Sequence, residues 1–392
     1  MNLAKKLWQR GLDLLPTSGF HFDRPLVLLQ SDDWGRVGLR DHEGREQLRA
    51  AGLVLGERPY DSYTLETADD VAALSEVLGR HHDSGGRSPC IEMNFVSTNL
   101  DFAKMREAGF QKIRTLALAD GLPEGWSRPG LMEGYRAGIA KGIFYPAVHG
   151  TTHFCIAAVE RNLTANEDRA ALLRTLWQAS TPYIYWRMPW IGYEYWDPEQ
   201  PEDERFLPRE TQKKLIGEAI GAFARLFSYL PRSGVAPGHR ANGDTHRAWA
   251  QHGIRVSQNG SGVIAPPHFD RYEVLNLSRV IDFEPATDAA FSLENCLHQA
   301  ESCFARGLPA IVSLHSINFH STVEDFRSRT LRNLDEFLAA LEARHSDLLY
   351  LHDADLYELV TKGQYESRNG VVNVKVTKKT FIKAAVARQG KA

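Results

Sequence analysis

Two adjacent aspartates stand directly after an apolar run near the start of this 392-residue chain. The run covers residues 25–30 (PLVLLQ), is typical of a buried parallel strand, and is followed by SDDWG, which contains Asp32 and Asp33. In α/β proteins, ligands bind at the carboxyl ends of such strands. Because adjacent side chains point in different directions, one carboxylate could bind a metal ion while the other faces a substrate. The alternative is a turn or a helix cap, which favours the same residue types.

Two histidines four residues apart follow another predicted strand, residues 143–148 (IFYPAV). In the motif HGTTH, the spacing of His149 and His153 predicts that both imidazoles lie on one side of a helical turn, where they could share a cation. The glutamate of the HExxH metalloproteases is missing, which disfavours that class. The alternative is two unrelated histidines, one of them a core residue.

Together, these motifs supply the three ligands that a catalytic metal site uses. Asp33, His149 and His153 would bind one divalent ion and leave positions open for water and substrate. Asp32, beside the ion, could accept the proton of that water. The sequence therefore indicates a metal-dependent hydrolase.

Two further strand ends carry candidate catalytic residues. The turn APGHR, residues 236–240, would direct Arg240 toward Asp32 and keep that carboxylate ionised and oriented, unless it is an ordinary surface turn. His315 ends the apolar run 310–314, where an imidazole could protonate a leaving group, unless it is a core histidine. His320 and Asp353 are the residues expected to orient it.

A long loop rich in aromatic residues is predicted at residues 186–208. Aromatic faces pack against the C–H faces of a sugar ring, so this loop favours a carbohydrate substrate, unless its rings only fix the loop to the barrel. The residues expected to bind substrate are Trp190, Tyr193 and Trp196 from this loop, with Trp34 and Asn94 from two strand ends.

The order of the motifs SDDWG, HGTTH, APGHR and LHS resembles the polysaccharide deacetylases. The resemblance spans residues 31–316 and implies a distorted (β/α) barrel, zinc or another divalent ion on Asp33, His149 and His153, Asp32 as general base, and His315 as general acid. Two positions depart from the family pattern. Gly150 replaces the usual serine or threonine, and APGHR replaces an arginine followed by prolines, which puts the role of Arg240 in doubt.

Predicted strands and helices alternate along the chain, which favours an α/β barrel with about seven parallel strands and extra helices and loops over a doubly wound open sheet. No glycine-rich nucleotide-binding motif is present. The predicted strands are 25–30, 90–96, 143–148, 233–236, 254–257, 274–281, 310–314 and 348–351, and the predicted helices are 69–79, 157–179, 210–230, 293–306, 323–344 and the segment ending at 360.

Composition limits the setting and the partners. A net charge of -3 gives no support for a nucleic-acid partner, and no apolar run has transmembrane length, so we expect a cytoplasmic protein. The expected domains are an N-terminal helix at 1–20, the barrel at 21–361 and a tail at 362–392 that forms an edge strand or stays mobile. The sequence does not indicate an oligomeric state.

The leading hypothesis for the reaction is removal of an acetyl group from an N-acetylated sugar. A backbone N–H of residues 149–152 would help to hold the developing oxyanion. One alternative is a glycoside hydrolase that uses Asp32 or Glu194 as a catalytic carboxylate. A metal-dependent amidase or esterase for a non-sugar substrate and an inactive binding protein are the others.

Overall fold

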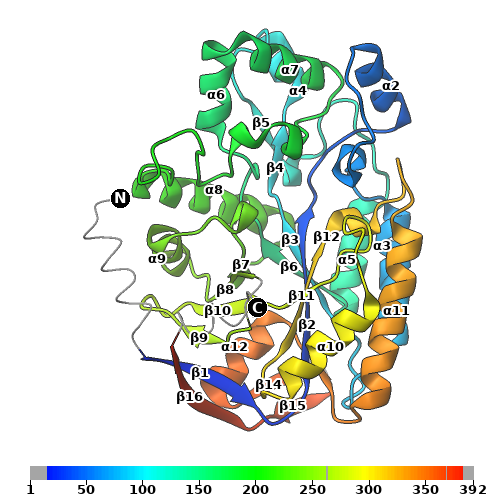
Figure 1. Ribbon diagram of the computed structural model, residues 1–392, viewed down its shortest axis with the longest axis vertical. Coiled ribbons are helices and arrows are strands. Elements are labelled where there is room, and N and C mark those ends of the chain that lie inside the picture. Colours follow the sequence, from blue (N-terminus) through cyan, green and yellow to red (C-terminus); the bar gives the residue numbers. More distant parts are fainter. Residues whose placement is uncertain (1–15, 262–263, 368, 383–392) are drawn as a thin grey trace.

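A curved and mainly parallel sheet forms the centre of the molecule (Figure 1). The structure is a computed structural model, and it describes residues 16–261, 264–367 and 369–382. Neighbouring strands pair in parallel except β9, which is antiparallel to β10. In spatial order the strands are β11 (Ile281–Asp282), β12 (Ala310–His315), β2 (Leu26–Trp34), β3 (Ile91–Phe95), β6 (Phe144–Val148), β7 (Ser233–Gly234), β8 (Val256–Ser261), β10 (Leu275–Arg279) and β9 (His268–Phe269), while β13 (Leu349–Tyr350) also pairs with β2.

The sheet curls until its two ends meet. Only Val280 separates β10 from β11, and its N–H donates to Ile311 O in β12 at 3.1 Å. If β10 and β11 are taken as one interrupted strand, the strands around the axis are β2, β3, β6, β7, β8, β10–β11 and β12. The predicted α/β class with about seven parallel strands is therefore confirmed.

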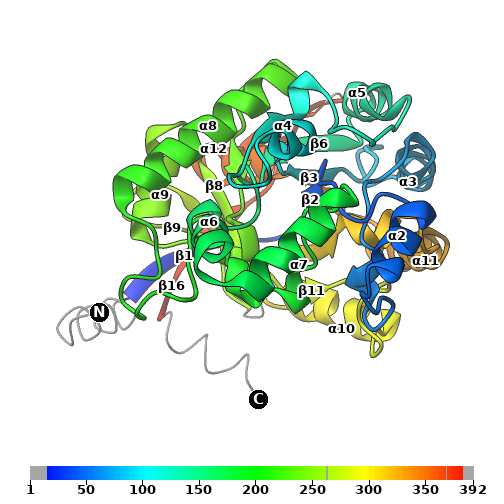
Figure 2. The ribbon, with the colours of Figure 1, turned by 90° about the horizontal axis from the view of Figure 1, so that it is seen from above.

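Amphipathic helices cover the outside of the sheet, as Figure 2 shows from above. All nine residues of β2 are buried, because helices cover one face of the sheet and the barrel interior fills the other. The surrounding helices are α3 (Ala68–Arg80), α5 (Leu131–Lys141), α8 (Arg209–Phe227), α9 (Gly243–Gln251), α10 (Leu293–Phe304), α11 (Arg327–Arg344) and α12 (Asp353–Lys362). No helix of the described residues has the length and apolar character to cross a membrane.

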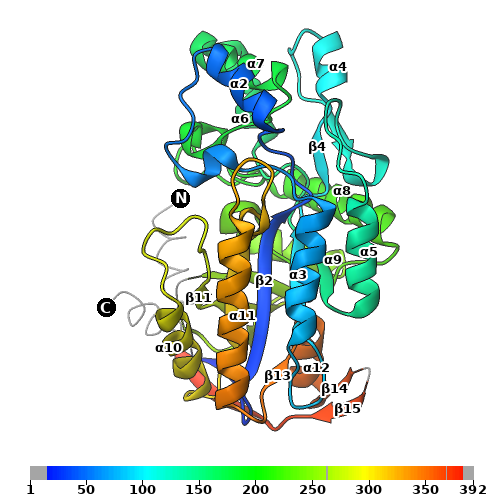
Figure 3. The same ribbon diagram turned by 90° about the vertical axis from the view of Figure 1, so that its right-hand side faces the viewer.

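A cap of short elements covers the carboxyl end of β2, toward which the arrow of that strand points (Figures 1 and 3). It includes α2 (His42–Ala50), α4 (Phe102–Glu107), α6 (Ile156–Ala165), α7 (Glu167–Gln178) and the pair β4 (Thr98–Leu100) and β5 (Thr115–Ala117). The single helix predicted over 157–179 is two helices, because Asn166 leaves the helical conformation and its side chain caps α7.

Short 3-10 turns complete the connections. They are η1 (Pro59–Ser62), η2 (Leu118–Asp120), η3 (Tyr185–Arg187), η4 (Pro189–Ile191), η5 (Pro237–His239) and η6 (Ser316–Phe319). Two of them, η3 and η4, lie in or beside the predicted aromatic loop, so that loop is ordered by local turns rather than by strands or longer helices.

The two ends of the described chain meet below the barrel. β1 (Pro16–Phe22) pairs antiparallel with β16 (Val376–Ile382), and β14 (Gln364–Ser367) pairs with β15 (Gly370–Asn373). Residues 16–20 were predicted as part of a helix and are strand instead, while the rest of that prediction, residues 1–15, lies outside the described residues. Of the two alternatives for the tail, the structure shows strands at Gln364–Ser367, Gly370–Asn373 and Val376–Ile382, and residues 383–392 lie outside the described part of the chain.

Candidate metal centre and active site

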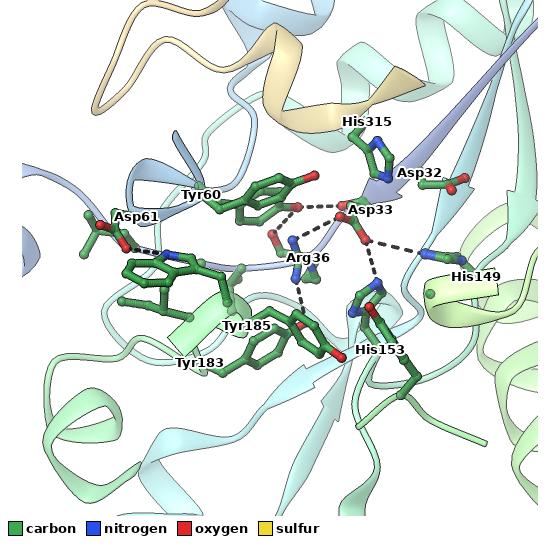
Figure 4. Close-up of a pocket in the computed structure, with 18 of the residues that line it drawn as sticks. Asp32, Asp33, Arg36, Tyr60, Asp61, His149, His153, Tyr183, Tyr185 and His315 are labelled. Carbon is green, nitrogen blue, oxygen red and sulfur yellow. Dashed lines mark hydrogen bonds and ion pairs between the residues drawn. The ribbon is translucent and has the colours of Figure 1, made fainter. Parts of the chain in front are cut away.

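Three predicted ligands converge at the carboxyl end of the barrel (Figure 4). The ligand atoms of Asp33, His149 and His153 all lie within 4.8 Å of one another, and no other such group occurs among the described residues. Asp33 Oδ1 is 3.1 Å from His153 Nε2 and 3.5 Å from His149 Nε2. The pairing of β2 with β3 shifts register after Ser31, and Asp33 has a φ of 74°, so Asp32 and Asp33 face different partners.

The two histidines do not lie on a helical turn, contrary to the prediction. The segment 149–153 is a loop with positive φ at Gly150 (78°) and His153 (66°). Glu194 of the aromatic loop holds this segment, because its carboxylate accepts bonds from Thr151 N (2.7 Å) and Thr151 Oγ1 (2.5 Å). A Cβ on residue 150 would lie 1.9 Å from Glu194 Oε2, which explains glycine at this position.

The donor atoms fit a divalent cation. Val235 O can only accept a hydrogen bond, so His149 Nδ1 carries the proton at 3.0 Å and His149 Nε2 keeps its lone pair. Burial lowers the pKa of His153 to about 3, which leaves a neutral imidazole. Asp33 Oδ1 is buried without a hydrogen-bond partner, as expected for a ligand oxygen. One carboxylate and two imidazoles form a set that zinc accepts.

Arg36 supports the metal centre and was missed in the sequence. Its Nη2 lies 3.1 Å from Asp33 Oδ2, its Nη1 donates to Tyr183 Oη at 2.6 Å, and its guanidinium lies 3.8 Å above the Tyr63 ring. Burial alone would raise the pKa of Asp33, but the adjacent Arg36 guanidinium holds that pKa well below its usual range. The only local signal was an arginine three residues after the aspartate.

Arg279, not Arg240, orients Asp32. Arg279 ends β10 and donates to both carboxylate oxygens of Asp32, at 2.7 and 2.8 Å. Although burial raises the pKa of Asp32, Arg279 holds it well below the usual range. Arg240 is exposed and lies over the Trp196 ring, 4.7 Å from its centroid. The prediction was wrong because β10 directs Arg279 inward, whereas Arg240 follows the surface turn η5.

A buried polar network fills the barrel below Asp32. Asn94 donates to Asp32 Oδ1 at 2.8 Å and to Gln258 at 2.7 Å, so it supports the carboxylate. It was predicted to bind substrate, but it does not line the cavity beside the metal ligands. Asp353 accepts from Gln258 and from Gln30 in this network and therefore does not orient His315. The pKa values of Asp353 and the adjacent Glu92 are both raised, chiefly by burial.

His315 ends β12 at the edge of the metal centre. Its Nδ1 is 2.6 Å from Glu284 Oε1. Burial would lower the pKa of His315, but Glu284 outweighs that effect and raises it to about 9, so the imidazole is protonated at neutral pH. Glu284 thus takes the orienting role predicted for His320, which instead accepts from Thr64 N at 3.4 Å.

A cavity of about 320 Å³ opens beside these groups. Of the five residues predicted to bind substrate, only Tyr193 lines it. Trp34 is fully buried and stacks on Phe319, Trp190 packs in the core under Arg169, and Trp196 lies against Arg240. The aromatic residues that do line the cavity are Tyr60, Tyr63, Tyr183, Tyr185, Trp186 and Tyr193.

His239 is a further cavity residue that sequence reasoning missed. Its Nε2 lies 3.8 Å from Asp32 Oδ2, and its Nδ1 donates to Asn259 O at 3.3 Å. Burial and the nearby Arg279 lower its pKa to about 4. The ring is therefore neutral at pH 7, with the lone pair of Nε2 on the side of Asp32.

Solved structures with a similar chain path include members of the group that the motifs resemble. No protein-family profile matches this sequence, and no curated protein is significantly similar to it. A Mycobacterium smegmatis protein assigned as a polysaccharide deacetylase is 13% identical over 86% of this chain and 91% of its own, with a TM-score of 0.44. A family 4 carbohydrate esterase from Streptomyces lividans, solved with acetate, is 11% identical over 84% and 92%, with a TM-score of 0.34.

An enzyme with a different activity is equally similar. The 4-alpha-glucanotransferase of Thermococcus litoralis is 10% identical over 87% of this chain and 40% of its own, with a TM-score of 0.44. One fold supports several activities, so likeness of this degree does not assign one.

Proposed function

We propose that this protein is a divalent-metal-dependent hydrolase that removes the acetyl group of an N-acetylated sugar. The observation that carries the proposal is the convergence of Asp33, His149 and His153 between an ionised carboxylate, Asp32, and a protonated imidazole, His315. Amide hydrolysis needs these functions together, because water must lose a proton and the leaving amine must gain one.

Each residue has a separate task in this reaction. A divalent ion held by Asp33, His149 and His153 would supply Lewis-acid polarisation of the acyl carbonyl and acidify a water molecule. Asp32, fixed by Arg279, provides a carboxylate to receive the proton of that water. His315 holds a proton for the leaving nitrogen, and Glu284 keeps it there.

Two of the four backbone amides expected to hold the oxyanion, those of His149 and Thr151, are already hydrogen-bonded. His149 N donates to Phe95 O at 2.8 Å, and Thr151 N donates to Glu194. Stabilisation of the developing charge is therefore assigned to the cation and to the protonated His315.

The geometry disfavours Glu194 as a catalytic carboxylate of a glycosidase. A glycoside hydrolase needs two carboxyl groups that face the substrate. Glu194 is 2% exposed, does not line the cavity, and is bonded to Thr151. The amidase or esterase alternative for a non-sugar substrate keeps the same chemistry and differs only in what fills the cavity.

The experiment pairs elemental analysis of the purified protein with acetate release from N-acetylated sugars and from non-sugar N-acyl and O-acyl compounds. We expect one divalent ion per chain and metal-dependent acetate release that falls at least about a hundredfold in Asp32→Asn. Arg240→Gln is the control and should retain activity, since Arg240 is exposed and does not contact Asp32. Full activity of Asp32→Asn would exclude Asp32 as the proton acceptor, and cleavage of a glycosidic bond without acetate would exclude the reaction.

A further inference from the structure

The ionised side chains around the cavity all face partners of opposite charge. A charged group on the substrate would therefore give up its hydration on entering the cavity. No described side chain there has an unpaired charge that could form an ion pair with it in return. The pairs are Asp32 with Arg279 (2.7 Å), Asp33 with Arg36 (3.1 Å), Asp61 with Arg187 (3.2 Å) and His315 with Glu284 (2.6 Å).

The other polar groups of the cavity are an imidazole and phenol hydroxyls. His239 Nε2 lies 3.8 Å from Asp32 Oδ2, and its Nδ1 is 3.3 Å from Asn259 O. The Tyr63 hydroxyl donates to Asp33 O at 2.7 Å and the Tyr183 hydroxyl accepts from Arg36 at 2.6 Å, while Tyr60 and Tyr185 also line the cavity. The cavity thus presents hydroxyl groups and ring faces, which suit an uncharged polyol.

At the Asp61 end of the cavity, the wall residues are bonded to one another. Trp186 Nε1 donates to Asp61 Oδ1 at 2.8 Å, while Asp61 Oδ2 accepts from Gly56 N at 2.9 Å and Glu57 N at 3.0 Å. Figure 4 shows Asp61 on the far side of the tyrosines from His149. A substrate chain cannot leave the cavity at this end without breaking the contacts that order the loop.

The side near His149 is closed by packing. Tyr193 stacks on Tyr185 with 4.8 Å between ring centroids, and a Cβ on Gly238 would lie 2.2 Å from the Tyr193 ring. No space for a further sugar unit remains between Gly238 and Tyr193. The cavity volume of about 320 Å³ is near the lower limit of small-molecule sites.

We infer that the site takes a single uncharged acylated unit of monosaccharide size and excludes an internal unit of a glycan chain. This inference rests on the proposed function. An internal unit needs room at each end for the rest of its chain, whereas the Trp186–Asp61 bond and the contact of Tyr193 with Gly238 occupy these two sides of the cavity.

The test compares acetate release by the wild-type metal-loaded protein from neutral N-acetylhexosamines, from the N-acetylated tetrasaccharide of the best of them, and from its phosphate ester. We expect the neutral monosaccharide to have a kcat/KM at least tenfold above that of either other compound. A tetrasaccharide or phosphate ester that is as good a substrate would overturn the inference.

Binding to Asp32→Asn separates the inference from the proposed reaction. If no compound releases acetate, the proposed reaction is wrong. Calorimetric measurement of ligand binding to this variant then tests the size limit of the cavity independently of the reaction. Tenfold tighter binding of the monosaccharide than of the tetrasaccharide supports the inference. Equal binding of the two, or no binding of any neutral monosaccharide, overturns it.

Opening one wall provides a second readout. Trp186→Ala removes the wall at Asp61 and should raise the tetrasaccharide-to-monosaccharide ratio of kcat/KM severalfold. Trp196→Ala changes the same loop outside the cavity and should leave the ratio unchanged. If Trp186→Ala does not fold, Trp186→Phe, which loses only the bond to Asp61 and part of the ring, should shift the ratio in the same direction. An unchanged ratio in a folded variant contradicts the wall assignment.

Discussion

Among the carboxylates near His315, Glu284 contributes most to keeping the imidazole protonated. Glu284 raises the pKa of His315 to about 9 against the burial that would lower it. Because this pKa is raised on folding, its contribution to stability is complete below the unfolded value near 6.5 and is lost as the pH rises through about 9.

Glu284→Gln should therefore move the alkaline limb of activity. Without the carboxylate, burial dominates and the pKa of His315 falls below 9, so kcat/KM should decline at a lower pH than in the wild type. A pH profile of kcat/KM and histidine NMR titration measure this shift. An alkaline limb that stays in place would show that His315 is not the acid that limits the rate.

Arg279 is the residue on which the state of Asp32 depends. Arg279→Met keeps most of the side-chain volume but leaves a buried carboxylate unpaired, which costs about 3–5 kcal/mol of folding free energy. We expect this loss in urea unfolding, together with a large fall in kcat.

Arg240→Met is the matched control for Arg279→Met. Arg240 is exposed, so its replacement should change the free energy of unfolding by no more than about 0.5 kcal/mol. Similar unfolding curves for the two variants would contradict the assigned roles of these arginines.

At the scale of elements, the ligand loop depends on its left-handed turn. Gly150 has a φ of 78°, and Glu194 occupies the space where a side chain would begin. Gly150→Ala should cost at least about 1–2 kcal/mol for the backbone alone and should weaken metal binding, because His149 and His153 flank the turn. Calorimetric titration with zinc measures the affinity.

The control for this loop is a glycine in a helix. Gly221 lies in α8, and no atom lies within 4 Å of the position that a Cβ would take there. Gly221→Ala should therefore stabilise the protein by about 0.5–1 kcal/mol and leave zinc affinity unchanged. If Gly150→Ala bound zinc as tightly as the wild type, the turn would not be what positions the ligands.

At the scale of the whole molecule, the proposed metal ion would join two separate parts of the barrel. Asp33 lies near the carboxyl end of β2, and both histidines follow β6, so an ion on all three would bind only the folded chain. Free metal at a hundred times its Kd should raise the free energy of unfolding by about 2.7 kcal/mol. Chelation should reverse this gain and abolish activity.

His153→Ala tests where that stabilisation arises. The variant lacks one ligand, so added metal should stabilise it much less than the wild type in thermal unfolding. Equal stabilisation of both proteins would place the ion elsewhere.

The sequence by itself determined the strand ends and the donor atoms. Apolar runs at 25–30, 143–148 and 310–314 correspond to β2, β6 and β12, and the polar residues that follow them lie at one end of the barrel. These inferences succeed because hydrophobic periodicity and ligand chemistry are local properties, and because the carboxyl ends of parallel strands must meet.

Only the tertiary structure decided which groups act on those residues. Arg279 is 247 positions from Asp32, Glu284 is 31 from His315, and four of the five residues expected to bind substrate lie elsewhere. Such pairs depend on strand register and on how the cap folds over the barrel, and a one-residue change of register would direct each side chain to the opposite face. Local sequence carries no record of that choice, which is why Arg240 was expected beside Asp32 and the structure has Arg279 there.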